Sequence, residues 1–537
     1  MRSYSVPFFA ILTILAVFGP AFATDHYVDV NTGDDANSGL SPDAAWKSIT
    51  HALEAGGGTQ DDQYIIHVAP GTYTTPLESF RLEVRPYTSV VGAGPDQVVI
   101  DANGTDSVFN LWYDNTLSGL TITGGGDGVF AGGKGVLMNA YCRIDNCVVR
   151  GNLYRGVDIE YPGDGFAQLN DCIIHGNGGG VFMTSQYGEG LVKVTRCLIS
   201  SNAATFGAAI YAVNTSLELV DSVIADNVAD IRGAGLLFSA CQGPLKSSDI
   251  QNCLFISNRT LDGLGGAASV DQTRFSGCTF VSNTATHGAS GLYAAARAVE
   301  VTDCIFRDGG DEISEPKAGL VRVNNSCVEG GWQGSGKYNL DADPLFVSGP
   351  FCDYYLSQRA AGQGQDSPCV DAGSMTAAAA GMAAKTTRTD GMPDTGVVDI
   401  GFHYPTHFTL PEVWVSNPSD TYSHGDTLEM VFKAMNPNPF SYPVELYAAI
   451  IAADGVIWTI DSSWNWSASL NPWFASLELP AGFIFGPTTL LTIALPSASP
   501  PISDPGAYFA AAAFAHVGTT TFIGQPSLSA FHLVADQ

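Results

Sequence analysis

Aromatic and acidic side chains occur close together on consecutive strand-like segments in the middle of the chain. The side chains of interest are Asp158, Glu160, Phe182, Tyr211 and Tyr293. Aromatic rings stack on the apolar faces of sugars, and carboxylates accept hydrogen bonds from sugar hydroxyls. These residues predict a carbohydrate-binding stripe, with the alternative that a loop or a second domain covers the rings. Acid–base catalysis would need two opposed carboxyl groups, which the sequence does not define.

Two acidic segments carry ligands of the type that calcium prefers. Their residues are Asp34, Asp35 and Asn37 near the N-terminus, and Asp390, Asp394 and Asp399 further along the chain. Neither segment follows the regular spacing of a calcium-binding loop. Because Asp beside Gly is also a common turn former, calcium binding and turn formation both stay open. No other cofactor is predicted.

One nine-residue phrase recurs seven times and indicates the architecture that positions these groups. Its first copy, at residues 144–152, reads IDNCVVRGN. The fourth position of the copies holds Cys147, Cys172, Cys197, Ser222, Cys253, Cys278 and Cys304, in steps of 25, 25, 25, 31, 25 and 26 residues. Such a repeat, without helical periodicity, is typical of one coil of a β-solenoid, in which equivalent residues stack about 4.8 Å apart.

Three further columns follow from this register. The position two residues after the cysteine is apolar and points inward with it, because side chains alternate along a strand. The position five residues after it holds Asn152, Asn177, Asn202, Asn227, Asn258 and Asn283. Stacked asparagines can bond neighbouring backbone at a bend, which predicts an internal ladder in preference to simple surface turns. A second strand follows each turn, with inward positions at Val157, Val181, Ile210, Leu236, Ala267 and Leu292.

The repeat also predicts where the solenoid is irregular and where it begins. Two steps are longer, at 29 and 31 residues, and should contain loops: they run from Val181 to Ile210 and from Ser222 to Cys253. Strand-like runs at residues 64–68 and 98–100 should begin the solenoid. An open end exposes strand edges, so a helix over residues 44–55 is expected to cap it. Its buried face would hold Trp46, Ile49 and Leu53.

The start of the chain and its net charge restrict location and partners. Residues 1–23 hold a basic residue, a short apolar run and Ala-Phe-Ala, which predicts a cleaved signal peptide, with an uncleaved anchor as the alternative. No later segment is long and apolar enough to span a membrane. The net charge of −30 disfavours nucleic acid and anionic membranes as partners. We expect a secreted or cell-surface protein, monomeric because a capped solenoid needs no partner.

Eleven cysteines in an exported chain would ordinarily indicate disulfides. Neighbouring cysteines in the column would have Cβ atoms about 4.8 Å apart, whereas a disulfide needs about 3.8 Å. The column cysteines are therefore predicted to be buried thiols that serve as small apolar fillers. Cys352 and Cys369 lie outside the column and are the disulfide candidate.

Several stretches resemble secreted proteins of the pectate-lyase-like β-helix superfamily. They are residues 27–53, VAPGTY at residues 68–73, the coil phrase, and the late stretches NLDADPLFV, SPCVDAGS and VDIGFHY. The resemblance implies a right-handed parallel β-helix over residues 24–405. It does not define an activity, since the fold hosts lyases, hydrolases, epimerases and non-catalytic proteins. The family's catalytic stretches, such as Gly-His-Gly of the hydrolases and Asp-Pro-His-Glu of the alginate epimerases, do not occur in this sequence.

The remaining residues, 406–537, lack the coil phrase. Alternating stretches at residues 427–434, 444–452 and 507–514 predict a small antiparallel β-sandwich. Four tryptophans here could form a carbohydrate platform or fill the core: Trp458, Trp464, Trp466 and Trp473. The predicted fold class is thus all-β. The predicted function is an exported, non-catalytic protein with a long binding face for polysaccharide, and the alternatives are a polysaccharide lyase or glycoside hydrolase and a structural adhesin or spacer.

Overall fold

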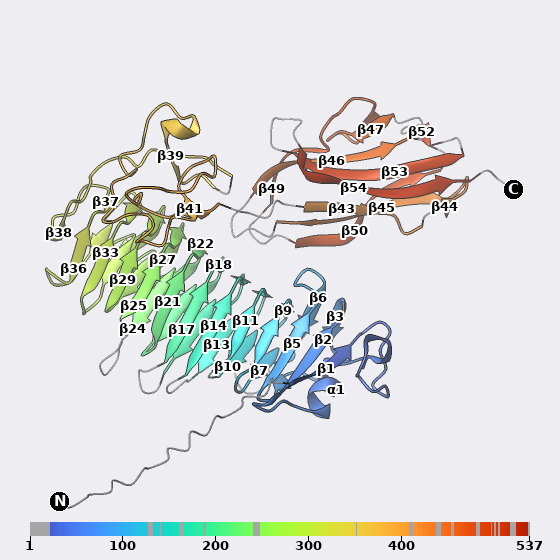
Figure 1. Cartoon of the computed structure of the whole chain (residues 1–537), viewed down its shortest axis with the longest axis horizontal. Coiled ribbons are helices and arrows are strands. Elements are labelled where there is room, and N and C mark those ends of the chain that lie inside the picture. Colours follow the sequence, from blue (N-terminus) through green and yellow to red (C-terminus); the bar gives the residue numbers. More distant parts are fainter. Residues whose placement is uncertain are drawn as a thin grey trace, which may run out of the picture.

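The protein is all-β in a computed structural model, with a long stack of parallel strands followed by antiparallel strands (Figure 1). The structure describes residues 22–126, 133–139, 141–160, 165–185, 190–239, 247–350, 352–406, 412–419, 421–436, 442–452, 456–479, 484–495, 497–498, 501–502, 505–515 and 522–534. Residues 1–21, which hold most of the predicted signal peptide, lie outside the described residues. No helix in these ranges has the length and apolar character needed to cross a membrane.

Most coils of the stack contribute one strand to each of three parallel sheets. Sheet A has 13 strands and runs from β1 (Phe22–Val28) to β38 (Ser335–Lys337). Sheet B has 11 strands, from β3 (Gly71–Thr74) to β37 (Cys327–Val328). Sheet C has 10 strands, from β4 (Leu82–Val84) to β35 (Ile313–Ser314). The predicted parallel β-helix is therefore confirmed.

The start of the solenoid agrees with the prediction in type and differs in extent. The two strand-like runs lie in β2 (Asp62–Val68) and β6 (Val98–Asp101). The cap helix α1 (Ile49–Ala55) is shorter than predicted, because Ser48 is its N-cap and accepts a side-chain hydrogen bond from the His51 N–H. Trp46 precedes the helix and forms a parallel β-bridge with Val28 of β1. Its buried ring therefore belongs to an extended segment and not to the helix face that the sequence predicts.

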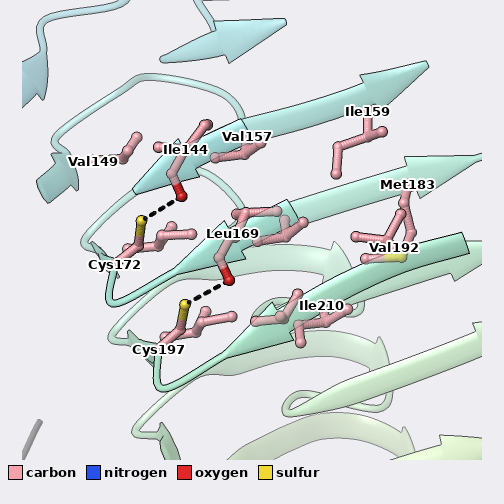
Figure 2. Close-up of a cluster of buried hydrophobic side chains, with 14 of the residues drawn as sticks. Ile144, Val149, Val157, Ile159, Leu169, Cys172, Met183, Val192, Cys197 and Ile210 are labelled. Carbon is pink, nitrogen blue, oxygen red and sulfur yellow. Dashed lines mark hydrogen bonds between the residues drawn. The ribbon is translucent and has the colours of Figure 1, made fainter. Parts of the chain in front are cut away.

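The cysteine column lies inside the coils, as the repeat predicts. Figure 2 shows Cys172 and Cys197 among apolar side chains, with each thiol directed at a carbonyl of the preceding coil. Cys172 Sγ donates to the Ile144 oxygen at 3.4 Å, and Cys197 Sγ donates to the Leu169 oxygen at 3.5 Å. The predicted role as apolar fillers is therefore incomplete, because the buried thiols also satisfy backbone carbonyls.

The asparagine column forms the predicted internal ladder. The backbone N–H and side-chain amide of Asn177 both donate to Oδ1 of Asn202, at 3.0 and 3.1 Å. The same pair of bonds joins every successive rung, and all its asparagines are buried: Asn152, Asn177, Asn202, Asn227, Asn258 and Asn283. The ladder thus satisfies polar groups at a buried bend in every coil.

The inward column of sheet C corrects one predicted position. Leu236 pairs with Ala268, and Ala268 pairs with Leu292, so Ala268 and not Ala267 holds the equivalent inward place. The outward neighbour in that coil is Ser269, which pairs with Tyr293. The interval from Asn258 to Ala268 is one residue longer than the intervals from Asn227 to Leu236 and from Asn283 to Leu292, which the apolar pattern did not reveal.

The loops that follow the asparagine turns in four successive coils form a fourth parallel sheet, sheet D. Its strands are β19 (Ala203–Phe206), β23 (Val228–Arg232), β27 (Arg259–Leu264) and β31 (Thr284–His287). The loop expected between Val181 and Ile210 is wrong in this part, because its extra residues form β19 and pair with β23. The extra residues of the step from Ser222 to Cys253 fall mainly at residues 240–246, outside the described residues. Sheet D stands beside sheet C as a wall.

The segment after the last coil returns over the outer face of sheet B. It contains the short strands β39 (Phe346–Val347), β40 (Tyr355–Leu356), β41 (Lys385–Thr386) and β42 (Tyr404–Pro405). Tyr355, Phe402 and Tyr404 share an apolar cluster with outward residues of sheet B, including Leu198, Val223 and Leu254. Asn252 fixes this segment by accepting from the His403 N–H at 2.7 Å and donating to the His403 oxygen at 2.9 Å. Both faces of sheet B are therefore buried in this region.

The C-terminal strands form antiparallel sheets that share one hydrophobic core. The three predicted stretches correspond to β45 (Thr427–Met435), β46 (Tyr442–Ile451) and β53 (Gly506–Ala515). β45 lies between β43 (Glu412–Ser416) and β50 (Ile484–Ala494), whereas β46 and β53 lie in a second sheet with β54 (Phe522–Leu533). Trp473 fills the core at 2% exposure, as one of the two predicted roles requires, while Trp464 is 59% exposed.

Candidate functional site

A groove of about 650 Å³ lies between the outer face of sheet C and sheet D. Its floor includes residues of β16 (Val181–Thr184) and β20 (Ile210–Val213), and its wall is formed by β19, β23 and β27. The side chains that give it chemical character are Leu153, Tyr154, Arg155, Phe182, Phe206, Tyr211, Asp230 and Leu261. Glycines at residues 178–180 line one side and leave backbone open to a ligand.

Arg155 is the central cation of the groove. Its guanidinium carbon lies 3.5 Å from the centre of the Phe182 ring and 4.7 Å from the centre of the Tyr154 ring. Its Nη1 also donates to Asp158 Oδ2 at 2.9 Å. Cation–π contact and a charge-assisted hydrogen bond therefore hold the guanidinium over the Phe182 ring.

Asp158 lies beneath the groove and does not face a ligand. Its side chain is fully buried, and Oδ2 also lies 2.8 Å from Lys134 Nζ. Lys134 also reaches Glu160 Oε1 at 3.3 Å, and Glu160 is not among the residues that line the groove. These two predicted ligand-binding carboxylates thus form an ion-pair network that supports Arg155.

The aromatic part of the predicted stripe is only partly assembled. Phe182 and Tyr211 pack edge to face with ring centres 5.3 Å apart, and Phe206 of sheet D lies 6.4 Å from Tyr211. Tyr293, on β32 (Leu292–Ala294), is three coils beyond Tyr211 and does not line the groove. The structure therefore brings Phe182 and Tyr211 together and leaves Tyr293 apart.

Sequence reasoning missed the residues on the other side of the groove. Arg155 and Tyr154 precede β13 (Val157–Glu160), and Phe206, Asp230 and Leu261 come from sheet D. The available signal was the longer interval between the asparagine turn and the next strand in consecutive coils. Because loops lengthened in several neighbouring coils lie above one another, they can build a wall beside the sheet.

The acidic segments considered for calcium use their carboxylates in protein contacts. Asp390 Oδ1 accepts from Arg388 Nε at 2.9 Å, which lowers the pKa of Asp390. Asp394 Oδ2 bonds His403 Nε2 at 2.9 Å, and Asp399 Oδ2 accepts from Gln358 Nε2 at 3.2 Å. Near the N-terminus, Asp35 accepts from the Lys47 and Ser48 N–H groups. In the ranges described, no group of three or more His, Cys, Asp or Glu side chains is arranged to hold a metal ion.

The disulfide candidate is not bridged. Cys352 Sγ lies 3.0 Å from Tyr404 Oη, and burial raises the pKa of the Cys352 thiol to about 12. Cys369 is buried elsewhere, beside Cys327, and this contact together with burial raises its pKa. The prediction of a Cys352–Cys369 disulfide is corrected accordingly, because the returning segment places the two thiols against different parts of sheet B.

Comparison with known proteins identifies the fold of the middle of the chain. Residues 107–280 match the protein family described as the right-handed beta helix region. The parallel β-helix is thus right-handed, as the resemblance in the sequence implies. No curated protein sequence matches this chain.

Some solved structures are similar over parts of the chain. Pectin methylesterase PemA from Erwinia chrysanthemi is 13% identical over 59% of this chain and 92% of its own, with a TM-score of 0.28. GH136 lacto-N-biosidase from Eubacterium ramulus is 11% identical over 57% of this chain and 64% of its own, with a TM-score of 0.27. The alkylpurine DNA glycosylase AlkC from Pseudomonas fluorescens is 11% identical over 24% of this chain, with a TM-score of 0.17, and this chain spans 32% of it.

Proposed function

We propose that this protein is an exported, non-catalytic β-helix protein that binds an uncharged polysaccharide in the groove between sheets C and D. The observation that carries the proposal is the surface formed by Arg155, Phe182 and Tyr211, in which a fixed guanidinium lies beside two half-buried rings. Rings of this kind supply apolar contact to sugar faces, and the guanidinium supplies donors to hydroxyls. Signal cleavage after residue 23 and a boundary between two domains near residue 405 belong to the same proposal.

The charges of the groove favour a neutral ligand. Arg155 is already paired with Asp158, and Asp230 adds a negative group at the wall. The chain as a whole carries a net charge of −30, so an anionic polymer would meet long-range repulsion. Asp230 can instead accept a hydrogen bond from a sugar hydroxyl.

Binding is proposed in preference to the alternative, hydrolysis or lysis of a polysaccharide. Glycoside hydrolysis by the usual route uses two carboxyl groups that flank the bond to be cleaved. Among the groove-lining residues that the structure describes, Asp230 is the one carboxylate. The experiment below therefore measures product release as well as binding.

The decisive experiment compares Phe182→Ala with Tyr293→Ala in the full-length mature protein. Both substitutions remove an outward ring from sheet C, but only Phe182 lines the groove. Affinity electrophoresis and calorimetry against neutral glucan, xylan and mannan should show about tenfold weaker binding for Phe182→Ala, or about 1.4 kcal/mol, and unchanged binding for Tyr293→Ala. Equal affinity of the two variants would refute the groove, and release of new chain ends by the wild-type protein would refute the non-catalytic role.

A further inference from the structure

Four aromatic rings form a continuous row at the turn that leads from sheet C to sheet A. Successive ring centres are 5.6, 5.3 and 5.3 Å apart, from Tyr87 to Tyr113, Tyr141 and Phe166. Tyr113 is 41% exposed and Phe166 is 38% exposed, so the row faces solvent. We call these four residues the corner row. The row and the groove lie at opposite edges of sheet C. The row lies where the chain passes from sheet C to sheet A, whereas residues between sheets B and C line the groove.

The backbone of the corner row is held by bonds from coil to coil. The Tyr87 N–H donates to the Tyr113 oxygen at 3.0 Å, and the Tyr141 N–H donates to the Phe166 oxygen at 2.7 Å. Beneath the row, the buried Asn115 Oδ1 accepts from the Tyr113 N–H at 3.1 Å, and its amide donates to the Thr88 oxygen at 3.1 Å. Hydrogen bonds thus fix the backbone that carries the rings, so less conformational entropy is lost when a ligand binds.

Two of the rings occupy a backbone conformation that bulky residues rarely adopt. Tyr87 has φ = 56° and Tyr141 has φ = 63°. At most turns of this solenoid the left-handed position is occupied by Gly, Asn, Asp or Ser, for which that conformation is easier. A tyrosine at such a position is strained, and Tyr338 outside the row shares this conformation with φ = 61°, so the row of rings and its polar border carry the site.

A column of polar side chains runs beside the corner row on the outer face of sheet A. Thr116 pairs with Arg143, and Arg143 pairs with Gln168, in consecutive coils. The Arg143 charge is partly offset by Asp145, whose Oδ2 lies 3.8 Å from Arg143 Nε. Hydroxyl, guanidinium and amide groups therefore border a line of rings, a combination that suits a ligand with apolar faces and hydroxyl edges.

We propose that the corner row is a second binding site, for an unbranched, uncharged polysaccharide that lies along the solenoid axis. The rings are tilted to one another by 71°, 58° and 79°, so sugar rings would contact those aromatic rings that present a face to the ligand. The spacing of the row is set by the coil repeat and is close to the size of one pyranose unit. The polar border disfavours a lipid tail, and the net negative charge of the chain disfavours a polyanion. This proposal uses no residue of the groove and stands or fails separately from it.

The test combines a variant with a measurement on the wild-type protein. Tyr113→Ala/Phe166→Ala removes two rings of the row, and Tyr338→Ala removes a more exposed tyrosine (69%) outside it. Affinity electrophoresis in gels with glucan, xylan, mannan or polygalacturonate should show retention of the wild type by at least one neutral polymer. The double variant should bind that polymer at least tenfold more weakly in the Phe182→Ala background, where the groove is disabled, and Tyr338→Ala should bind unchanged.

Hydroxyl-radical footprinting of the wild-type protein gives a readout that does not depend on a variant folding. A hexasaccharide of the retained polymer should protect Tyr113 and Phe166 from oxidation and leave Tyr338 unprotected. Protection confined to Tyr154 and Phe206 would place the ligand in the groove alone and overturn the corner-row proposal. Retention by polygalacturonate only, or by no polymer, would overturn it as well.

Discussion

Asn283 ends the asparagine ladder on a carboxylate: its N–H and its side-chain amide donate to Asp308 Oδ1 at 2.7 and 2.8 Å. The other oxygen, Oδ2, is buried and has no hydrogen-bond partner within the described residues. Glu312 lies next to it and accepts from the Asp308 N–H at 3.0 Å. Burial and the neighbouring Glu312 raise the pKa of Asp308 well above its ordinary value of 3.8, and burial also raises the pKa of Glu312.

Stability should therefore depend on the ionisation of Asp308. Because its pKa is higher in the folded state, the folded protein binds more protons than the unfolded chain, and stability falls as pH rises from 3.8 through the raised pKa. Asp308→Asn keeps the acceptor for Asn283 and removes the charge, so it should raise the free energy of unfolding at pH 7 by about 1–2 kcal/mol. Denaturant unfolding at pH 4 and pH 7 measures this, with the exposed Asp311→Asn as control. An equal gain at both pH values would contradict the ionisation argument.

A break in the middle of the ladder should be costly and local. Asn202→Ala removes the acceptor for two bonds from Asn177 and the side-chain donor to the Ile174 oxygen. Buried donors are left without partners, so we expect a loss of about 2–4 kcal/mol. Hydrogen exchange should increase most in the coils above and below Asn202, because each coil contacts only its neighbours. The exposed Thr284→Ala serves as control, and uniform exchange along the solenoid would argue against the ladder as the cause.

The column thiols should be unreactive in the folded protein. Burial raises the pKa of Cys147 to about 12 and raises that of Cys172 well above its usual range. The thiolate is the reactive form, so alkylation by iodoacetamide at pH 8 should be negligible at both sites. Mass spectrometry of peptides from native and guanidinium-unfolded protein measures the difference, with the unfolded sample as the positive control. Rapid native labelling of Cys147 would show that the coil is open there.

The ion-pair network under the groove should couple stability to binding. Asp158→Asn leaves Lys134 and Arg155 without their shared buried anion, which should cost about 3–5 kcal/mol. Glu160→Gln is the matched control, because its side chain is 41% exposed and its loss should cost less than about 1 kcal/mol. Thermal denaturation and calorimetry against the retained glycan give both quantities. If Asp158→Asn kept full affinity, Arg155 would not depend on Asp158 for its position.

The sequence predicted the coil and its register well because identical residues stack in a solenoid. The cysteine and asparagine columns each report the same repeat, and their hydrogen bonds confirm it. The inward position at Ala268 was misplaced by one residue because alanines and glycines carry no periodic signal there. Sheet D was not foreseen, since its strands pair through backbone groups that any polar or apolar residue can supply.

The candidate site was harder to predict for physical reasons. Phe182 and Tyr211 follow from strand alternation, but the position of Arg155 on the Phe182 ring depends on side-chain conformation and on the buried Asp158.

The segment that covers sheet B did leave a signal in the sequence. The residue directly after the cysteine column is outward, yet it is apolar in most coils: Val148, Ile173, Leu198, Val223, Leu254 and Ile305. Apolar residues on both faces of a strand indicate burial from both sides.

The returning segment over sheet B bears on the order in which the molecule can be completed. The coils are synthesised first, and the apolar stripe through Leu198, Val223 and Leu254 is then exposed to water. Tyr355, Phe402 and Tyr404 are synthesised only after the last coil, and together they bury this stripe. A chain that ends before residue 355 would leave this apolar stripe exposed. Incomplete chains would therefore be prone to aggregate, whereas complete chains would not.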